Sequence, residues 1–403
     1  MEKRIYLDNS ATTPVRPEVL EAVYPFLTEH GGNPSSRHKE GRIAKTAFEN
    51  AREQVAHAIN CQTKEIIFTS CATEANNSVL KGYLSGLRGK VVKNHIITTA
   101  VEHPSVFATA KALEKDGYEV TFLPVDKFGR IDLELLKSSI KENTGLISVM
   151  MVNNETGNIY PVKEIGKIAS EKGVLFHIDA VQAIGKVPVD VKEIGCDFLT
   201  LTAHKFYGLK GAGVLFVKWG KWTAPFITGG HQEKNRRAGT ENVVGVVGLG
   251  KAIELAVSEQ AEESERLRKL RDHFEKRVLE EIPYTRIVGD PDGRVSFISN
   301  ISFRFIEGEA ILLKLDYEGI AVSTGSACSS GNLEPSHVVT AMKIDPEESH
   351  SSIRFSLGRS TTLEDMEYTV EKLKNIIQQL RSFSPVYDKF ITQNQKESDR
   401  RVQ

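Results

Sequence analysis

A lysine stands just beyond a short apolar run, beside an imidazole and several hydroxyls. This residue, Lys205, belongs to Thr-Leu-Thr-Ala-His-Lys-Phe-Tyr-Gly at 200–208, directly before a glycine-rich stretch at 208–213. An amine in that place can form an imine with an aldehyde. A surface lysine in a loop is the alternative, because lysine is ordinarily exposed.

An acid and an amide strengthen the interpretation as an imine-forming lysine. Asp179 ends the apolar run 175–179, one predicted strand before Lys205, and Gln182 follows three residues later. A carboxylate there suits the partner of a pyridinium nitrogen, and a protonated ring makes pyridoxal phosphate an effective electron sink. Capping of a helix N-terminus is the alternative role for Asp179.

Two further segments could hold parts of such a cofactor. Residues 68–77, Phe-Thr-Ser-Cys-Ala-Thr-Glu-Ala-Asn-Asn, join a strand to a helix expected to begin near Thr73. Free N–H groups and the helix dipole make that turn an anion site, although a simple capping box uses the same residue types. His103 follows another strand end, where an imidazole could stack on a ring or be purely structural.

The most discriminating feature is a cysteine among small residues. Cys328 lies in Ser-Thr-Gly-Ser-Ala-Cys-Ser-Ser-Gly-Asn at 323–332. A cysteine in an exposed, flexible loop is suited to act as a nucleophile, and an incidental free thiol is the alternative. Downstream, Arg354 lies in the β-rich run 352–356 and could hold an α-carboxylate through two parallel hydrogen bonds. A salt bridge within its own domain is the alternative for Arg354.

Alternating strands and helices must position these side chains. Nearly continuous apolar strands with helices between them indicate a mostly parallel sheet covered on both faces. Ligands of such α/β sheets bind beyond the carboxyl ends of the strands. The expected strands are 65–69, 95–99, 119–123, 146–152, 175–179, 198–202 and 214–217, and the expected helices are 74–87, 105–115, 133–141 and 162–172.

A different pattern follows the glycine-bearing stretch 243–250. Apolar residues spaced three or four apart predict a long amphipathic helix over 258–282. Strands at 295–303, 320–322 and 352–356 precede a closing helix at 363–380. We therefore expect a large domain over 15–257 and a smaller α+β domain made of 1–14 and 258–382. A polar, frayed tail is expected over 383–403.

Composition excludes several classes of protein. The 403 residues carry 52 Lys+Arg and 53 Asp+Glu, a net charge of −1, which gives no support for binding to nucleic acid or an anionic membrane. No apolar run approaches the roughly 20 residues of a membrane span. The N-terminus shows no signal-peptide core. Four cysteines without a CxxC pair predict no metal site and no disulfide framework, and hence a reducing cytoplasm.

Together these motifs resemble the cysteine desulfurases, pyridoxal phosphate enzymes of fold type I in the class V aminotransferase group. The closer resemblance is to the iron–sulfur-assembly and nitrogen-fixation type with a short cysteine loop. It implies a mostly parallel seven-stranded sheet with a smaller α+β domain. The motifs are Tyr-Leu-Asp-Asn-Ser-Ala-Thr-Thr-Pro at 6–14, Ala-His-Lys at 203–205, Arg-Ala-Gly-Thr-Glu-Asn at 237–242, Gly-Ser-Ala-Cys-Ser-Ser-Gly-Asn-Leu-Glu-Pro-Ser at 325–336, and Arg-Phe-Ser-Leu-Gly-Arg at 354–359.

The resemblance implies a role for each candidate residue. Lys205 would carry the cofactor as an imine, Asp179 would pair with the ring nitrogen, and His103 would stack on the ring and relay protons. Arg354 would take the substrate carboxylate and Cys328 would accept sulfur. The remaining implied cofactor contacts are Asn154 and Gln182 near the ring's 3-oxygen, with Thr73, Thr202, His204 and, from the other subunit of a homodimer, Thr240 at the phosphate.

The implied activity converts L-cysteine to L-alanine and leaves the sulfur as a persulfide for an acceptor protein such as an iron–sulfur scaffold. A selenocysteine lyase, another class V enzyme such as a transaminase, and a non-catalytic assembly scaffold are the alternatives. A transaminase needs no thiol, so Cys328 argues against it. Three positions depart from the usual pattern of the family: Leu209 replaces proline, Thr202 replaces serine and Cys71 replaces glycine.

Overall fold

A seven-stranded sheet forms the centre of the larger part of the protein. The computed structural model describes residues 4–86, 93–324, 336–345, 348 and 350–402. The strand order is β2-β8-β7-β6-β5-β3-β4; β8 is antiparallel to β2 and β7, and the other neighbours are parallel. This confirms the predicted sheet. The strands are β2 Ile66–Thr69, β3 His95–Thr99, β4 Glu119–Leu123, β5 Thr144–Met150, β6 Leu175–Asp179, β7 Phe198–Thr202 and β8 Gly213–Val217.

Both faces of this sheet are covered, because successive strand residues point to opposite sides. In β2, Ile67 packs in one apolar cluster with α3 and α4, whereas Ile66 and Phe68 pack in a larger cluster that includes α2, α6 and α9. Burial on both sides explains why the strands are nearly continuous apolar runs. The helices of this part are α1 Pro17–Thr28, α2 Lys39–Ala58, α3 Ala72–Gly86, α4 Pro104–Lys115, α5 Leu133–Ser139, α6 Val162–Glu171, α7 Val191–Ile194, α8 Gln232–Asn235 and α9 Val243–Ser258.

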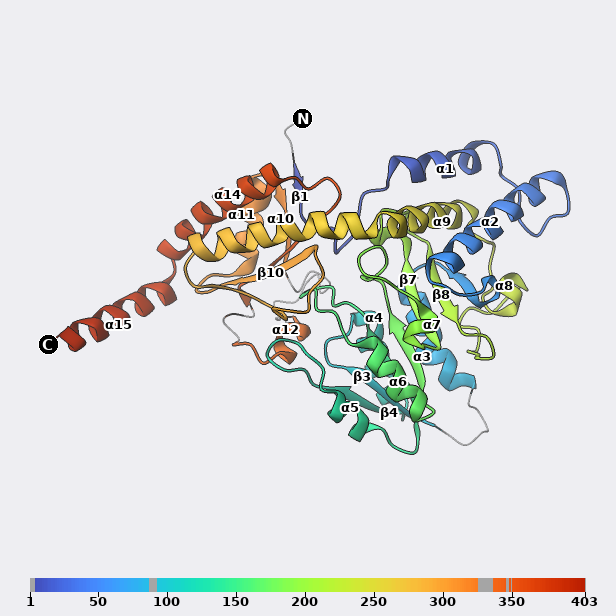
Figure 1. Ribbon diagram of the computed structural model, residues 1–403, viewed down its shortest axis with the longest axis horizontal. Coiled ribbons are helices and arrows are strands. Elements are labelled where there is room, and N and C mark those ends of the chain that lie inside the picture. Colours follow the sequence, from blue (N-terminus) through green and yellow to red (C-terminus); the bar gives the residue numbers. More distant parts are fainter. Residues whose placement is uncertain (1–3, 87–92, 325–335, 346–347, 349, 403) are drawn as a thin grey trace.

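A four-stranded antiparallel sheet with the order β12-β13-β10-β9 forms the second part. The predicted long helix is present as α10, which continues from α9 (Figure 1). The N-terminal β1 joins this part by pairing in parallel with β11. The elements are β1 Ile5–Tyr6, α10 Gln260–Glu281, β9 Thr285–Ile287, β10 Ile298–Phe303, α11 Gly308–Tyr317, β11 Ile320–Ala321, β12 Ser323–Thr324, α12 His337–Ala341, β13 Ser352–Ser356 and α14 Leu363–Ser382.

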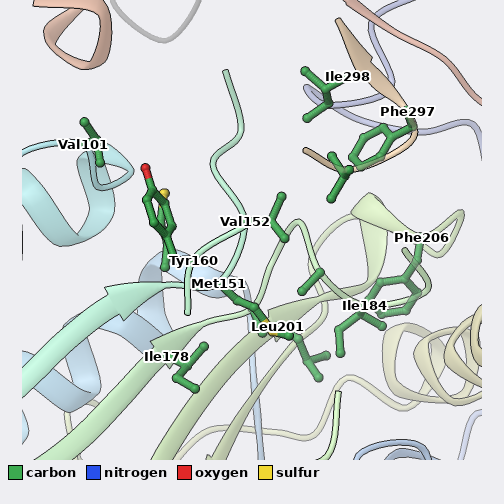
Figure 2. Packing of buried hydrophobic residues seen from close by; sticks show 14 of the residues in the cluster. Val101, Met151, Val152, Tyr160, Ile178, Ile184, Leu201, Phe206, Phe297 and Ile298 are labelled. Atoms are coloured by element: carbon green, nitrogen blue, oxygen red, sulfur yellow. The ribbon is translucent and has the colours of Figure 1, made fainter. Parts of the chain in front are cut away.

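One hydrophobic cluster connects the two sheets. Val152, which follows β5, and Ile184, which follows β6, belong to the same buried cluster as Phe297 and Ile298 at the start of β10 (Figure 2). The loops beyond the carboxyl ends of the parallel strands are therefore packed against the second sheet. Packing of this kind gives fixed positions to the polar side chains that these loops carry.

The expectation of a frayed tail is wrong for most of its length. Helix α15, Pro385–Val402, continues the chain and extends away from the body of the molecule (Figure 1). The ring of Phe390 lies 4.7 Å from that of Phe305 and 5.2 Å from that of Tyr284. These aromatic contacts anchor the start of the helix, and they join positions that are far apart in the sequence.

Candidate active site

The predicted lysine and acid follow neighbouring strands of the large sheet. Asp179 is the last residue of β6, and Lys205 lies three residues beyond β7 in the short 3-10 turn Ala203–Lys205. The two strands pair in parallel, so both residues lie at one edge of the sheet. The imidazole of His103 lies within the electrostatic reach of both charges, and burial lowers its pKa below the ordinary value. The structure therefore brings these three residues together.

Backbone carbonyls of the N-terminal segment hold the amine of Lys205. Its Nζ donates to the carbonyl oxygens of Ser10 at 2.6 Å and Ala11 at 2.8 Å. Gln182 also donates to the Ser10 oxygen, at 2.9 Å. This segment belongs to the motif at 6–14, for which the sequence predicted no role in the site. Through these hydrogen bonds the N-terminal segment contacts both Lys205 and Gln182 and forms part of the wall of the site.

Asp179 accepts hydrogen bonds on both carboxylate oxygens. The amide of Asn76, from α3, donates to Oδ2 at 2.8 Å, and the backbone N–H of Val181 donates to Oδ1 at 3.0 Å. The residues after Asp179 form turns, not an α-helix, so the alternative role as a helix cap is not observed. Each carboxylate oxygen has two acceptor positions, which leaves capacity for a cationic ring N–H.

Asn76 was not identified from the sequence. Its amide nitrogen also donates to the Ser105 hydroxyl at 2.8 Å, and its side-chain oxygen is buried without a partner among the described residues. Ser105 in turn contacts Nδ1 of His103, at 2.8 Å from its hydroxyl and 3.1 Å from its backbone N–H. Because a backbone N–H can only donate, Nδ1 is the acceptor and Nε2 carries the proton. Asn76 thus links the acid to the imidazole.

Hydroxyls and a helix N-terminus lie on the side predicted for the phosphate. Thr73 is exposed in the first turn of α3, where the leading N–H groups of a helix have no partner within it. Thr202 donates to the Ala212 carbonyl at 3.0 Å, so its lone pairs can still accept. Burial, followed by the charge of Lys205, lowers the pKa of His204 to about 4. His204 is therefore neutral near pH 7.

The segment that carries Thr240 is fixed by two ion pairs. The buried guanidinium of Arg52 binds Glu233 at 2.7 Å, and Arg237 binds Glu74 of α3 at 2.9 Å. Glu233 begins three consecutive residues with positive φ, 46°, 58° and 66°, a conformation that costs roughly 1–2 kcal/mol per residue. Thr240 itself is exposed. Its contact with a second subunit stays a prediction.

Arg354 is buried in β13 and contacts the N-terminal segment. Its Nη2 donates to the Asp8 carboxylate at 2.8 Å and its Nη1 to the backbone oxygen of Asn154 at 2.9 Å. Its Nε is buried without a partner among the described residues. The salt-bridge alternative is thus observed, though the partner lies outside the small sheet. The contact of the Asn154 side chain with a ring stays a prediction.

Two buried acids flank the site, and the sequence did not reveal either one. Glu102, directly before His103, has a pKa raised to about 8 by burial. Glu155, directly after Asn154, has a pKa raised to about 7 by burial. The only signal in the sequence was their position next to candidate residues. Both contact the start of α12: the Glu155 carboxylate accepts from the Ser336 hydroxyl, and the backbone oxygen of Glu102 accepts from His337.

The remaining predictions concern the thiols and Leu209. Cys328 lies outside the described residues. Cys71 is half-buried at the N-terminus of α3, with its sulfur 3.7 Å from the Ser70 hydroxyl. Leu209, where the family usually has proline, lies close to Gly248 of α9. Packing of the Leu209 side chain on α9 therefore restrains the loop after Lys205, which a proline at position 209 would restrain through its fixed backbone angle.

The described residues fit pyridoxal phosphate. An amine, a buried carboxylate with spare acceptor positions and a neutral imidazole meet at one sheet edge. The unpartnered amide oxygen of Asn76 and the unpartnered Nε of Arg354 are buried groups that a bound molecule could satisfy. The N-terminus of α3 supplies N–H groups for a phosphate.

Comparison with known proteins extends this description to almost the whole chain. The model of the class-V aminotransferase family matches residues 5–369. The cysteine desulfurase IscS of Dictyoglomus turgidum is 51% identical over 385 residues, which cover 96% of this chain and 97% of that protein. Among solved structures, a NifS-like protein has a TM-score of 0.88 at 37% identity, covering 94% of this chain and 100% of its own. The structure of SspA in complex with cysteine has a TM-score of 0.79 at 34% identity, covering 88% and 99%.

Proposed function

The chain belongs to the class-V aminotransferase family, in its cysteine desulfurase branch, and we propose that it converts L-cysteine to L-alanine with Cys328 as the sulfur acceptor. The observation that carries the proposal is the convergence of Lys205, Asp179 and His103 at one sheet edge. A solved relative, SspA, is similar over 88% of this chain and has cysteine as its ligand, which supports the substrate.

We assign the cofactor contacts as follows. Pyridoxal phosphate, when bound, supplies an electron sink that stabilises negative charge at the substrate Cα. Lys205 would hold it covalently, and Asp179 would keep its ring nitrogen protonated. The other residues that would hold it are Asn154 and Gln182 at the 3-oxygen, His103 on the ring, and Thr73, Thr202, His204 and the partner's Thr240 at the phosphate.

The protein's own side chains bind substrate and move protons. The buried guanidinium of Arg354 binds the carboxylate of L-cysteine, which aligns the amino acid. The amine of Lys205 takes the Cα proton. His103 is neutral and carries its proton on Nε2, so it can donate that proton near the substrate.

The sulfur step conserves atoms and electrons. The Cys328 thiolate attacks the substrate sulfur, an S–S bond forms and the substrate C–S bond breaks. The electron pair of the broken bond stays with carbon, which takes a proton and leaves as alanine. The sulfur that remains on Cys328 is a persulfide, ready for transfer to the thiol of an acceptor protein such as an iron–sulfur scaffold.

We propose that the enzyme acts as a homodimer. Leu20, Tyr24 and Leu27 lie on one face of α1 and are 49%, 62% and 64% exposed. A second copy of the chain would cover this apolar stripe. It would also bring its Thr240 to the phosphate, as the family resemblance implies.

We place the reaction in the cytoplasm. Cys61, Cys71 and Cys196 are free thiols, as expected in a reducing compartment. Among the described residues, no helix has both the length and the apolar character needed to span a bilayer.

Trapping of the cofactor tests the proposal. Borohydride reduction of protein loaded with pyridoxal phosphate should attach the cofactor to Lys205, identified by peptide mass analysis. The C328A variant should keep this adduct and lose desulfurase turnover, whereas C61A should keep both. Full turnover by C328A would contradict the proposed nucleophile. Alanine release from L-selenocysteine but not from L-cysteine would identify a selenocysteine lyase.

A further inference from the structure

Asn76 is a fully buried amide that reaches the acid of the site from α3. A carboxylate can only accept hydrogen bonds, so the atom that lies 2.8 Å from Oδ2 of Asp179 is the amide nitrogen. The second N–H of this nitrogen is directed to the Ser105 hydroxyl, also at 2.8 Å. Both N–H groups of the amide are therefore used, and these two partners fix its orientation.

This orientation leaves the side-chain oxygen of Asn76 buried without a partner among the described residues. A buried acceptor without a hydrogen bond lowers the stability of the folded protein. An apolar side chain of similar size would fill the same space without that loss. The benefit of Asn76 therefore lies in the hydrogen bonds that its nitrogen donates, and one of them is to Asp179.

Helix α3 holds this donor in place before any ligand binds. Leu80 of the helix is fully buried and belongs to one apolar cluster with Phe198 of β7 and Leu215 of β8. The helix is thus packed against the sheet whose strand ends carry Asp179 and Lys205. A donor that packing has already fixed needs no rearrangement when charge develops beside it.

Hydrogen bonds to Asp179 influence where a proton lies in the loaded enzyme. In the pairing that we assign, the proton shared with the ring can lie on the ring nitrogen, which leaves Asp179 negative, or on Asp179, which leaves both groups neutral. N–H donors stabilise the negative carboxylate and so favour the first arrangement. Asn76 supplies one such donor and the backbone of Val181 supplies another. The cofactor is the better electron sink while its ring nitrogen is protonated.

We infer that Asn76 is a positioning residue for the reaction: its hydrogen bond to Asp179 helps to keep the shared proton on the ring nitrogen. This inference rests on the proposed function. N76L should move the distribution of that proton toward Asp179 about tenfold and lower kcat to a similar extent. The effect is partial because the Val181 donor remains. Asn76 is assigned no contact with L-cysteine, so KM should stay within about twofold of the native value.

The test observes the ring nitrogen itself. Holoenzymes saturated with pyridoxal phosphate that is isotopically labelled at this atom are studied by nitrogen NMR without substrate, which distinguishes a protonated from an unprotonated ring. N76A repeats N76L with a smaller side chain. N77L is the matched control, because it makes the same substitution at the next residue of α3, whose amide donates to the Thr73 carbonyl. S105A is the second control, because it removes the other acceptor of Asn76 and retains the contact with Asp179.

We expect the ring-nitrogen resonance to move toward the unprotonated position in N76L and N76A and to keep its native position in N77L and S105A. Alanine release should show the loss of kcat at nearly constant KM in both Asn76 variants. A native resonance in either Asn76 variant would overturn the inference. An equal displacement in N77L or S105A, or a rise in KM that accounts for the lost activity, would also overturn it. A native enzyme that carries no cofactor on Lys205 would contradict the proposed function instead.

Discussion

Glutamine in place of Glu102 removes a titrating group from the core and keeps its shape. Oε1 of Glu102 accepts from the Thr99 hydroxyl at 2.7 Å and from the Met150 backbone N–H at 3.0 Å, and Oε2 has no partner among the described residues. The amide oxygen of glutamine can accept the same two hydrogen bonds. Burial, with a smaller contribution from the charge of Asp179, raises the pKa of Glu102 from 4.5 to about 8.

The sign of the effect follows from this raised pKa. Folded protein holds the Glu102 proton more tightly than unfolded protein does. The stabilisation is therefore complete below pH 4.5 and is lost as the pH rises through about 8. At about 1.4 kcal/mol per pKa unit, the native chain should lose about 2–3 kcal/mol relative to E102Q between roughly pH 5.5 and 7.5.

Urea unfolding of both proteins across this pH range measures the difference. The free energy of unfolding of E102Q minus that of the native chain should grow as the pH rises. E134Q is the control, because the Glu134 side chain is 80% exposed and the same substitution is then made outside the core. Parallel profiles for E102Q and the native chain would refute the assignment of Glu102 as a buried, protonated acid.

Three further predictions follow from other contacts. R354Q should raise KM for L-cysteine about 30- to 100-fold through loss of the charged hydrogen bonds to the carboxylate, measured by alanine release; an unchanged KM contradicts that role. In R52M the Glu233 side chain, 4% exposed, stays buried without its ion-pair partner, so the free energy of unfolding in urea should fall by about 3–5 kcal/mol. K163M removes an exposed ion pair and should lower that free energy by at most about 1 kcal/mol. Equal effects of the two substitutions would contradict the buried pair. F390A should speed hydrogen exchange over residues 385–393 by releasing α15 from its aromatic contacts, and unchanged exchange contradicts that anchor.

The sequence predicted the large sheet well because its strands are buried on both faces. Runs such as 198–202 contain apolar side chains directed to both sides, and the structure has β7 over the same residues. The acid at the end of β6 and the lysine after β7 could be placed together because parallel strands end at one edge. Burial of the strands on both faces and the parallel direction of β6 and β7 therefore explain most of the success.

Contacts between distant segments could not be predicted in this way. The Asn76 amide reaches Asp179 from another helix, and Ser336 reaches Glu155 across the two sheets. No local pattern marks such pairs, because each residue type is also common on surfaces. The prediction of a frayed tail was wrong for the same reason. The tail is polar in composition, but Phe390 packs on the ring of Tyr284, which is far away in the sequence.

Mass analysis after exposure to L-cysteine tests the central claim most directly. The holoenzyme should gain about 32 Da, one sulfur atom, and peptide mapping should place it on Cys328. The adduct should disappear on reduction and should be absent from C328A. An enzyme that releases alanine while the adduct lies on Cys61, Cys71 or Cys196, or that forms none, would contradict the account.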